Sequence, residues 1–146
     1  MSSTPSHFSL VLETPPASPE AAHRHFLAKL SVETDASDVM LDLQRGQHSF
    51  LLIDARSAQE FEECHIPGAI SLPYRKITAE STAQFSKAQP IVAYCWSPAC
   101  NAATKAAARL SALGFQVKEM LGGIEYWRRE GGVVEGTLGE QAPLIH

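Results

Sequence analysis

Short apolar runs alternate along the chain with segments in which apolar residues recur every three or four positions. Two of the runs, SFLLID (49–54) and PIVAY (90–94), have the length and continuity of strands that are buried on both faces of a sheet. Shorter runs at LSVE (30–33), ISLPY (70–74) and FQVKEM (115–120) predict further strands. The pattern therefore predicts five strands, two of them central.

Helical patterns fill the stretches between these runs. Ser18, Pro19 and Glu20 have the order of a helix start, and Ser57 with Glu60 forms the S-x-x-E pattern of a capping box. Helices are predicted at 18–29, 36–43, 57–64, 102–113 and between the glycine pairs 122–123 and 131–132. Strands and helices that alternate at this spacing are typical of an α/β sandwich with a mostly parallel sheet.

The same pattern divides the chain into segments. Residues 1–17 are expected to form a loosely ordered arm, because Pro15 and Pro16 exclude regular helix there. The helix at 18–29, an α/β domain at 30–132 and a C-terminal tail at 133–146 follow.

Composition and charge narrow the range of partners and compartments. The chain has 146 residues and a formal net charge of -4, which does not favour nucleic acid or an anionic membrane surface as a partner. No apolar run is long enough to cross a bilayer, and the first residues lack the basic and apolar regions of a secretory signal. The three cysteines are irregularly spaced, which favours free thiols and predicts a cytoplasmic protein.

Cys95 stands where chemistry is expected. It directly follows the apolar run 90–94 and precedes the helix at 102–113, and ligands in open α/β sheets bind beyond the carboxyl ends of the strands. Free N–H groups and the positive end of the helix dipole would stabilise a thiolate there and lower its pKa. Cys95 is therefore a candidate nucleophile. The alternative is a small core residue, since free cysteines are often buried.

Several blocks in sequence resemble the rhodanese superfamily. LLIDARSAQEFEECHIPGAISLPY (51–74) is followed by IVAYCWS (91–97), LGF (113–115) and LGGIEYW (121–127), and the resemblance spans about 30–131. It implies a three-layer sandwich whose mainly parallel five-stranded sheet is flanked by helices. It also implies transfer of a sulfane sulfur through a cysteine persulfide.

The resemblance assigns roles to individual positions. Cys95 resembles the persulfide-forming cysteine. By the same resemblance, the recurrent polar positions of the family correspond to Asp54, Arg56, Glu60 and His65. The block that packs beside the active loop corresponds to Gly122, Gly123 and Trp127. Structural interpretations remain beside these: Asp54 would bond backbone amides or pair with Arg56. His65 would hold the turn through a backbone group rather than act as a base, and Trp127 would fill the core.

The loop after Cys95 is the candidate substrate- or anion-binding loop, and it departs from the family pattern. Its residues are Trp96, Ser97, Pro98, Ala99, Cys100 and Asn101. Rhodaneses usually have C-x-x-G-x-R, whereas here no charged residue occurs at 96–104. Because binding a dianion normally needs a cation or many donors, thiosulfate is disfavoured as the donor unless Lys105 or Arg75 reaches the loop. Asn101 is expected to be the N-cap of the following helix.

Other functions compete with sulfur transfer. Phosphatases and arsenate reductases of this fold family use C-x-x-x-x-x-R, but Asn101 occupies the place of that arginine. Cys100 is a possible resolving thiol, which would make the pair with Cys95 a thiol redox site, or it packs at the helix start. A domain that keeps the fold without the chemistry is a further alternative. The cysteines and histidines lack the usual zinc-ligand spacing, so no metal site is expected.

The sequence therefore predicts a sulfurtransferase that carries a sulfane sulfur on Cys95. The expected partners are a small sulfur donor and a thiol or cyanide acceptor, with a protein acceptor as a further option. No cofactor, nucleic acid or membrane is expected to take part.

Overall fold

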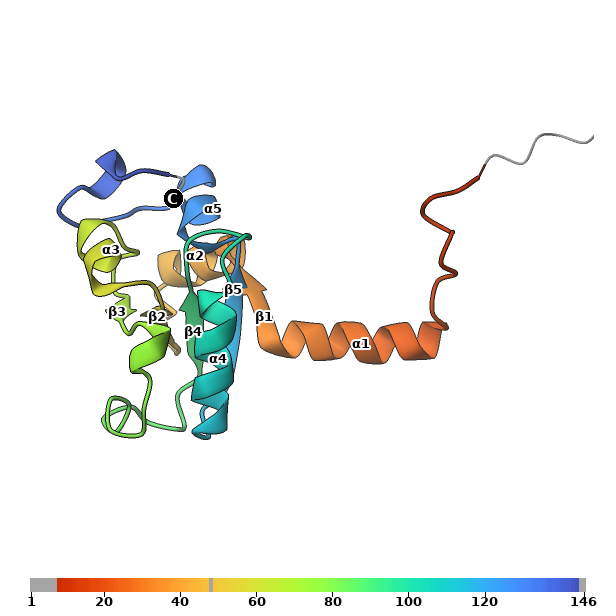
Figure 1. Cartoon of the computed structure of the whole chain (residues 1–146), viewed down its shortest axis with the longest axis horizontal. Helices are drawn as coiled ribbons and strands as arrows, with labels where there is room; N and C mark the ends of the chain where they lie inside the picture. Colours follow the sequence, from red (N-terminus) through yellow and green to blue (C-terminus); the bar gives the residue numbers. More distant parts are fainter. Residues whose placement is uncertain (1–7, 48, 145–146) are drawn as a thin grey trace, which may run out of the picture. The chain divides into compact units, whose positions relative to one another are not determined.

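A computed structural model describes residues 8–47 and 49–144 and contains a five-stranded sheet (Figure 1). The first seven residues of the predicted arm and the last two of the predicted tail lie outside the described residues. The strands are β1 (Glu33–Asp35), β2 (Leu51–Asp54), β3 (Ile70–Ser71), β4 (Ile91–Tyr94) and β5 (Val117–Leu121). Their order is β1-β5-β4-β2-β3 and every pair is parallel, which confirms the predicted α/β class.

Strand β4 lies at the centre of the sheet, and all four of its residues are buried. Ile91 and Ala93 belong to the core on one face of the sheet, and Val92 and Tyr94 belong to the core on the other. This alternation is what a strand that is covered on both faces requires. Cys95 continues the alternation on the same face as Ala93.

The helices are α1 (Pro19–Val32), α2 (Ala36–Gln44), α3 (Ala58–Glu63), α4 (Ala102–Ala112) and α5 (Gly123–Arg129), and two 3-10 turns, η1 (Tyr74–Lys76) and η2 (Gly139–Gln141), complete the elements. Helices α2, α4 and α5 cover the two faces of the sheet (Figure 1). Helix α4 packs in the core with Ala93, whereas α2 and α5 pack in the core with Tyr94. Each predicted helix is therefore present, within a few residues of its predicted bounds.

The predicted strand at 30–33 is wrong in its position. Helix α1 continues to Val32, and strand β1 begins only at Glu33. The sequence between Lys29 and Glu33 contains no glycine or proline that would end the helix earlier. Leu30 and Val32 are also exposed, so no buried strand face required the earlier change.

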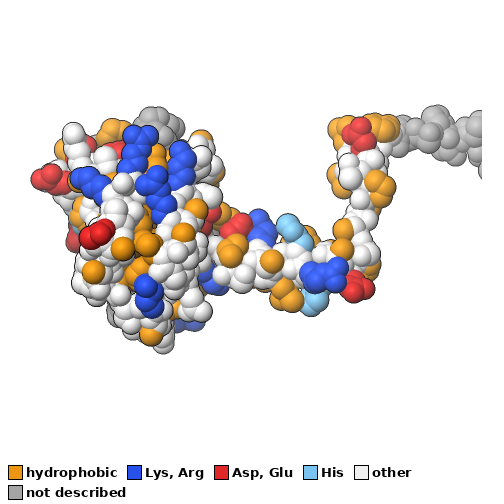
Figure 2. Space-filling model, turned by 60° about the horizontal axis from the view of Figure 1, so that its bottom comes forward, with side chains coloured by type: hydrophobic (Ala, Val, Ile, Leu, Met, Phe, Trp, Pro, Cys, Tyr) orange, Lys and Arg blue, Asp and Glu red, His pale blue; other side chains and the backbone are white. Residues whose placement is uncertain are grey.

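Contacts divide the chain into two compact units, Met1–Leu30 and Ser31–His146. Helix α1 contributes no buried residue, and Phe26 and Leu27 are more than half exposed on it. Hydrophobic side chains are visible along its surface in Figure 2. Both core clusters lie in the second unit. No helix in the part of the chain that the structure describes is long and apolar enough to cross a membrane.

Candidate active site

Cys95 follows the last residue of β4, at the carboxyl edge of the sheet, as predicted. The first turn of α5 fixes the backbone at this point: Ile124 N–H donates to the Cys95 carbonyl at 2.9 Å, and Glu125 N–H donates to the Trp96 carbonyl at 2.9 Å. Gly123 makes this approach possible. A Cβ atom there would lie 2.5 Å from the Trp96 carbonyl carbon, and its φ of +64° is one that glycine tolerates.

The loop after Trp96 folds into a tight turn. Cys100 N–H donates to the Ser97 carbonyl at 3.0 Å, with Pro98 at the second position of the turn, where its fixed φ is favourable. Ala99 N–H donates to Ser97 Oγ at 3.2 Å. These two amides are therefore engaged within the loop instead of pointing at the thiol.

Helix α4 begins at Ala102, next to the predicted N-cap Asn101. The Asn101 carbonyl accepts from Lys105 N–H, but the Asn101 side chain makes no capping hydrogen bond, so that part of the prediction is wrong. Its φ of -106° and ψ of 15° lie outside the extended region that N-cap residues usually adopt. The free amide of Ala103, in the first turn of the helix, instead hydrogen-bonds the Cys95 thiol.

The prediction of a lowered pKa for Cys95 is wrong for this conformation. The residue is only 3% exposed, and burial raises the pKa of its thiol to about 12. Backbone hydrogen bonds from Ala103 and Trp96 act in the opposite direction, but the neighbouring Cys100 adds to the increase. The Cys95 thiol donates to the Cys100 carbonyl at 3.3 Å, a contact that favours the protonated form.

A buried ion pair between Asp54 and Arg56 contacts the loop through the Trp96 ring. Asp54 is fully buried and accepts both the Arg56 amide, at 3.0 Å, and the Arg56 guanidinium, at 2.8 Å, as the structural interpretation predicted. Burial disfavours the charged guanidinium, yet the hydrogen bond and charge of Asp54 raise the pKa of Arg56. The guanidinium also donates to the Cys64 carbonyl and lies 4.7 Å from the Trp96 ring centroid.

Glu60 connects helix α3 to the loop, which the sequence did not reveal. One carboxylate oxygen accepts from the Ser57 amide and hydroxyl in the predicted capping box, and the other accepts from the Trp96 indole N–H. Partial burial opposes ionisation, but the hydrogen bonds from Ser57 and Trp96 lower the pKa of Glu60. Glu60 therefore orients Trp96 as an ionised acceptor. Nothing in the local sequence links residues that are 36 positions apart.

His65 holds a turn, as predicted. Its Nδ1 lies 2.6 Å from the Phe61 carbonyl oxygen, and its ring stacks on the Phe61 ring with centroids 3.8 Å apart. Its Nε2 lies 3.1 Å from a carboxylate oxygen of Glu135, in the C-terminal tail. Trp127 is buried in the core, also as predicted, and its indole N–H donates to the Val133 carbonyl.

A cavity of about 250 Å³ opens beside the loop. Trp96 and Cys100 line one side, and Tyr74 and Arg75 from η1 line another. Cys95 does not line it, but its thiol donates to the carbonyl of Cys100, which does. The sequence named Arg75 as a residue that could reach the loop, and the structure places it at this cavity; it gave no signal for Tyr74.

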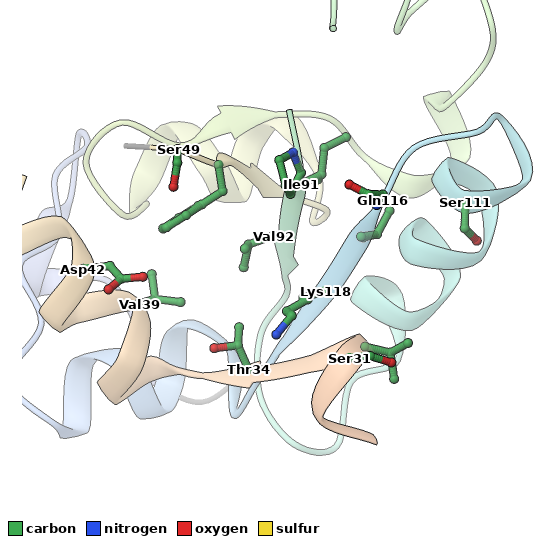
Figure 3. Close-up of a pocket in the computed structure, with 14 residues that line it drawn as sticks. Ser31, Thr34, Val39, Asp42, Ser49, Ile91, Val92, Ser111, Gln116 and Lys118 are labelled. Atoms are coloured by element: carbon green, nitrogen blue, oxygen red, sulfur yellow. The ribbon is translucent and has the colours of Figure 1, made fainter. Parts of the chain in front are cut away.

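A larger cavity, of about 630 Å³, lies at the opposite edge of the sheet (Figure 3). Ile91 and Val117, the first residues of β4 and β5, line it together with Thr34 of β1. Among the described residues, no cysteine or histidine lines it. Size alone would favour this cavity as a binding site, but Cys100 and the carboxyl end of β2 lie at the smaller one.

Comparison with known proteins agrees with this arrangement. The family description "Rhodanese-like domain" matches residues 35–130. The HTH-type transcriptional regulator Rv0324 of Mycobacterium tuberculosis is 35% identical to this chain over 95 residues. The matched region covers 65% of this chain but only 40% of the length of Rv0324. The thiosulfate sulfurtransferase GlpE of Pseudomonas savastanoi pv. phaseolicola is 37% identical over 79 residues, which cover 53% of this chain and 72% of GlpE.

A crystal structure of similar fold comes from the BH2092 protein of Bacillus halodurans. It is 52% identical in sequence with a TM-score of 0.86, and the match covers 88% of this chain and 94% of that one. Three observations point to the same family: the family match over residues 35–130, the parallel five-stranded sheet, and the cysteine loop between β4 and α4. This chain belongs to the rhodanese-like domain family.

Proposed function

We propose that the domain is a sulfurtransferase that carries a sulfane sulfur as a persulfide on Cys95 and passes it to a thiol or cyanide. The observation that carries the proposal is the position of Cys95 beyond the carboxyl end of central strand β4, packed against Ala102 and Ala103 in the first turn of helix α4. Similarity to a protein named as a thiosulfate sulfurtransferase supports it.

Sulfur loading would begin with the Cys95 thiolate. The thiolate attacks the outer sulfur of the donor, a new S–S bond forms at Cys95, and the S–S bond of the donor breaks. The electron pair leaves with the rest of the donor, and the proton of Cys95 passes to that leaving group or to water. The Trp96 and Ala103 amides stabilise the negative charge on sulfur during this step.

Cys95 is buried and protonated in the described conformation, so loading also requires a movement. The Ser97–Cys100 turn is half-exposed to exposed and rests on few hydrogen bonds. Rotation of the Cys100 carbonyl away from the thiol would remove an interaction that favours the protonated form and would leave the two amides as its partners. The proposed enzyme therefore loads sulfur through a minor open conformation of the loop.

The mass of the intact protein tests the proposal. After treatment with thiosulfate or a small persulfide, the protein should gain one sulfur atom and lose it again on addition of cyanide. Cys95→Ser should gain none, whereas Cys64→Ser should load normally, because Cys64 packs in the core on the other face of the sheet. Loading that persists in Cys95→Ser would assign the reaction to another residue and overturn the proposal.

The contact between the two loop cysteines favours thiol redox chemistry as a second candidate. The Cys95 thiol donates to the Cys100 carbonyl at 3.3 Å, the side chains interact, and both thiols are free. Mild oxidation should then give a Cys95–Cys100 disulfide in peptide maps, with loss of two hydrogen atoms to the oxidant. A redox protein would cycle between these forms in the absence of any sulfur donor, and a plain sulfurtransferase would not.

A further inference from the structure

Three cations surround one aromatic ring at the cavity beside Cys100. The charged ends of Arg75, Lys105 and Arg109 lie 5.4, 5.2 and 5.3 Å from the Tyr74 ring centroid. Arg75 comes from η1, and the other two come from successive turns of α4. Two hydrogen bonds fix the cluster: Arg75 Nε donates to the Tyr74 hydroxyl at 2.9 Å, and Arg109 donates to the Tyr74 carbonyl at 2.8 Å.

Acidic side chains do not balance this cluster. Among the described residues, no carboxylate lies within ion-pair distance of Arg75, Lys105 or Arg109. The hydrogen bond from Arg75 and the charge of Lys105 lower the pKa of the Tyr74 phenol, as an excess of positive charge requires. Lys and Arg side chains gather on one face of the unit in Figure 2, although the whole chain has a net charge of -4.

We propose that the cavity lined by Tyr74, Arg75, Trp96 and Cys100 is the acceptor site, and that it takes a small thiol with two or more anionic groups. The cations would bind the anionic groups at the mouth while the thiol enters toward Cys100 and Cys95. This inference rests on the proposed sulfurtransferase function, because it assigns the acceptor for that reaction.

Size and position favour a small, multiply charged acceptor. The cavity of about 250 Å³ is smaller than most ligand pockets. It admits a small molecule that carries a few carboxylate groups, but not a folded protein. The cations lie at Tyr74 and not inside the loop that holds Cys95, so they act on charges at a distance from the reacting sulfur. This arrangement suits an acceptor whose thiol and anionic groups are separated.

The transfer of sulfur to the acceptor needs no further reactant. The acceptor thiolate attacks the outer sulfur of the Cys95 persulfide and forms a new S–S bond. The bond between that sulfur and Cys95 Sγ breaks, and the electron pair remains on Sγ, which takes the proton that the acceptor released. The acceptor leaves as a persulfide, and Cys95 returns to the thiol.

Matched thiols and matched variants test the inference. Mercaptosuccinate supplies a thiol with two carboxylates, and 2-mercaptoethanol supplies a neutral one. We expect the ratio of kcat/KM for mercaptosuccinate to that for 2-mercaptoethanol to fall about tenfold in the double variant R75Q/K105Q, since two charge-assisted contacts are removed. The same ratio should fall with rising ionic strength. Lys87→Gln is the control, because Lys87 also lies over an aromatic ring, that of Phe115, but does not line the cavity.

A binding measurement separates this inference from the proposed function. Cys95→Ser cannot transfer sulfur, yet it should bind mercaptosuccinate under reducing conditions, with a dissociation constant that rises about tenfold when R75Q and K105Q are added. Equal binding by the variants with and without these two changes would overturn the acceptor site even if sulfur transfer proceeds. Absence of transfer to any thiol, with the expected loss of binding, would overturn the sulfurtransferase proposal and leave the anion site supported.

Discussion

At the scale of single residues, the state of Cys95 depends on its surroundings more than on its place in the chain. Its position after β4 and before α4 predicted a stabilised thiolate, and that position is confirmed. Burial, however, raises the pKa of the thiol to about 12, and two backbone amides do not compensate. Sequence shows which helix follows a cysteine, but not which loop amides are already engaged with Ser97.

The raised pKa leads to a prediction about alkylation of Cys95. A thiol with a pKa far above neutral has a thiolate fraction that grows tenfold with each pH unit, so its rate with iodoacetamide should rise about a hundredfold from about pH 7 to about pH 9. Peptide mapping would follow Cys95 separately from Cys64 and Cys100. A rate that is already constant above about pH 7 would instead show a stabilised thiolate and contradict the buried, protonated state.

At the scale of elements, local signals are reliable where the partners are close in sequence. The capping box of Ser57 and Glu60 forms as predicted, because both hydrogen bonds lie within one helical turn. The end of α1 and the link from Glu60 to Trp96 were missed, because the first lacks a stop signal and the second joins elements that meet only in the folded sheet. The cation cluster on Tyr74 likewise requires η1 and α4 to be neighbours.

The junction of β5 and α5 gives a prediction at this scale. Gly123→Ala would place a Cβ atom 2.5 Å from the Trp96 carbonyl carbon, so the turn or the loop must shift. We expect a loss of about 1–3 kcal/mol in unfolding free energy from the left-handed backbone, together with a reduced rate of sulfur loading because the Cys95 backbone moves. Urea denaturation and loading kinetics would measure the two effects.

Gly139→Ala is the matched control for this change. Gly139 has a similar φ of +53°, but a Cβ atom there meets nothing within 4 Å. It should show the loss of stability that backbone strain causes without the loss of sulfur loading. Equal loading rates in the two variants would mean that contact between Gly123 and the loop does not position Cys95.

At the scale of the whole molecule, residues 133–144 pack onto the rest of the second unit, and no sequence pattern predicted these contacts. Arg128 donates to the carbonyls of Glu140, Ala142 and Pro143 at 3.0 to 3.1 Å, and Glu135 pairs with His65 through backbone hydrogen bonds of 2.8 and 2.9 Å. Every residue has a backbone carbonyl, so the pattern of side chains does not reveal hydrogen bonds that a distant arginine makes to such carbonyls. Fold class, order of elements and the position of Cys95 were predictable because they depend on local periodicity and motif order.

These tail contacts lead to a final prediction about Cys64, which is 3% exposed and lines a cavity together with Ala142 and Pro143. Arg128→Ala removes three hydrogen bonds to the tail, so local opening should become more frequent and Cys64 should react with iodoacetamide about ten times faster. The neighbouring Arg129→Ala is the control, because Arg129 pairs with Glu125 and not with the tail. If Cys64 reacted equally slowly in both variants, the packing of Ala142 and the backbone hydrogen bonds of Glu135 with His65 would suffice to hold the tail, and the Arg128 hydrogen bonds would not be what limits access to Cys64.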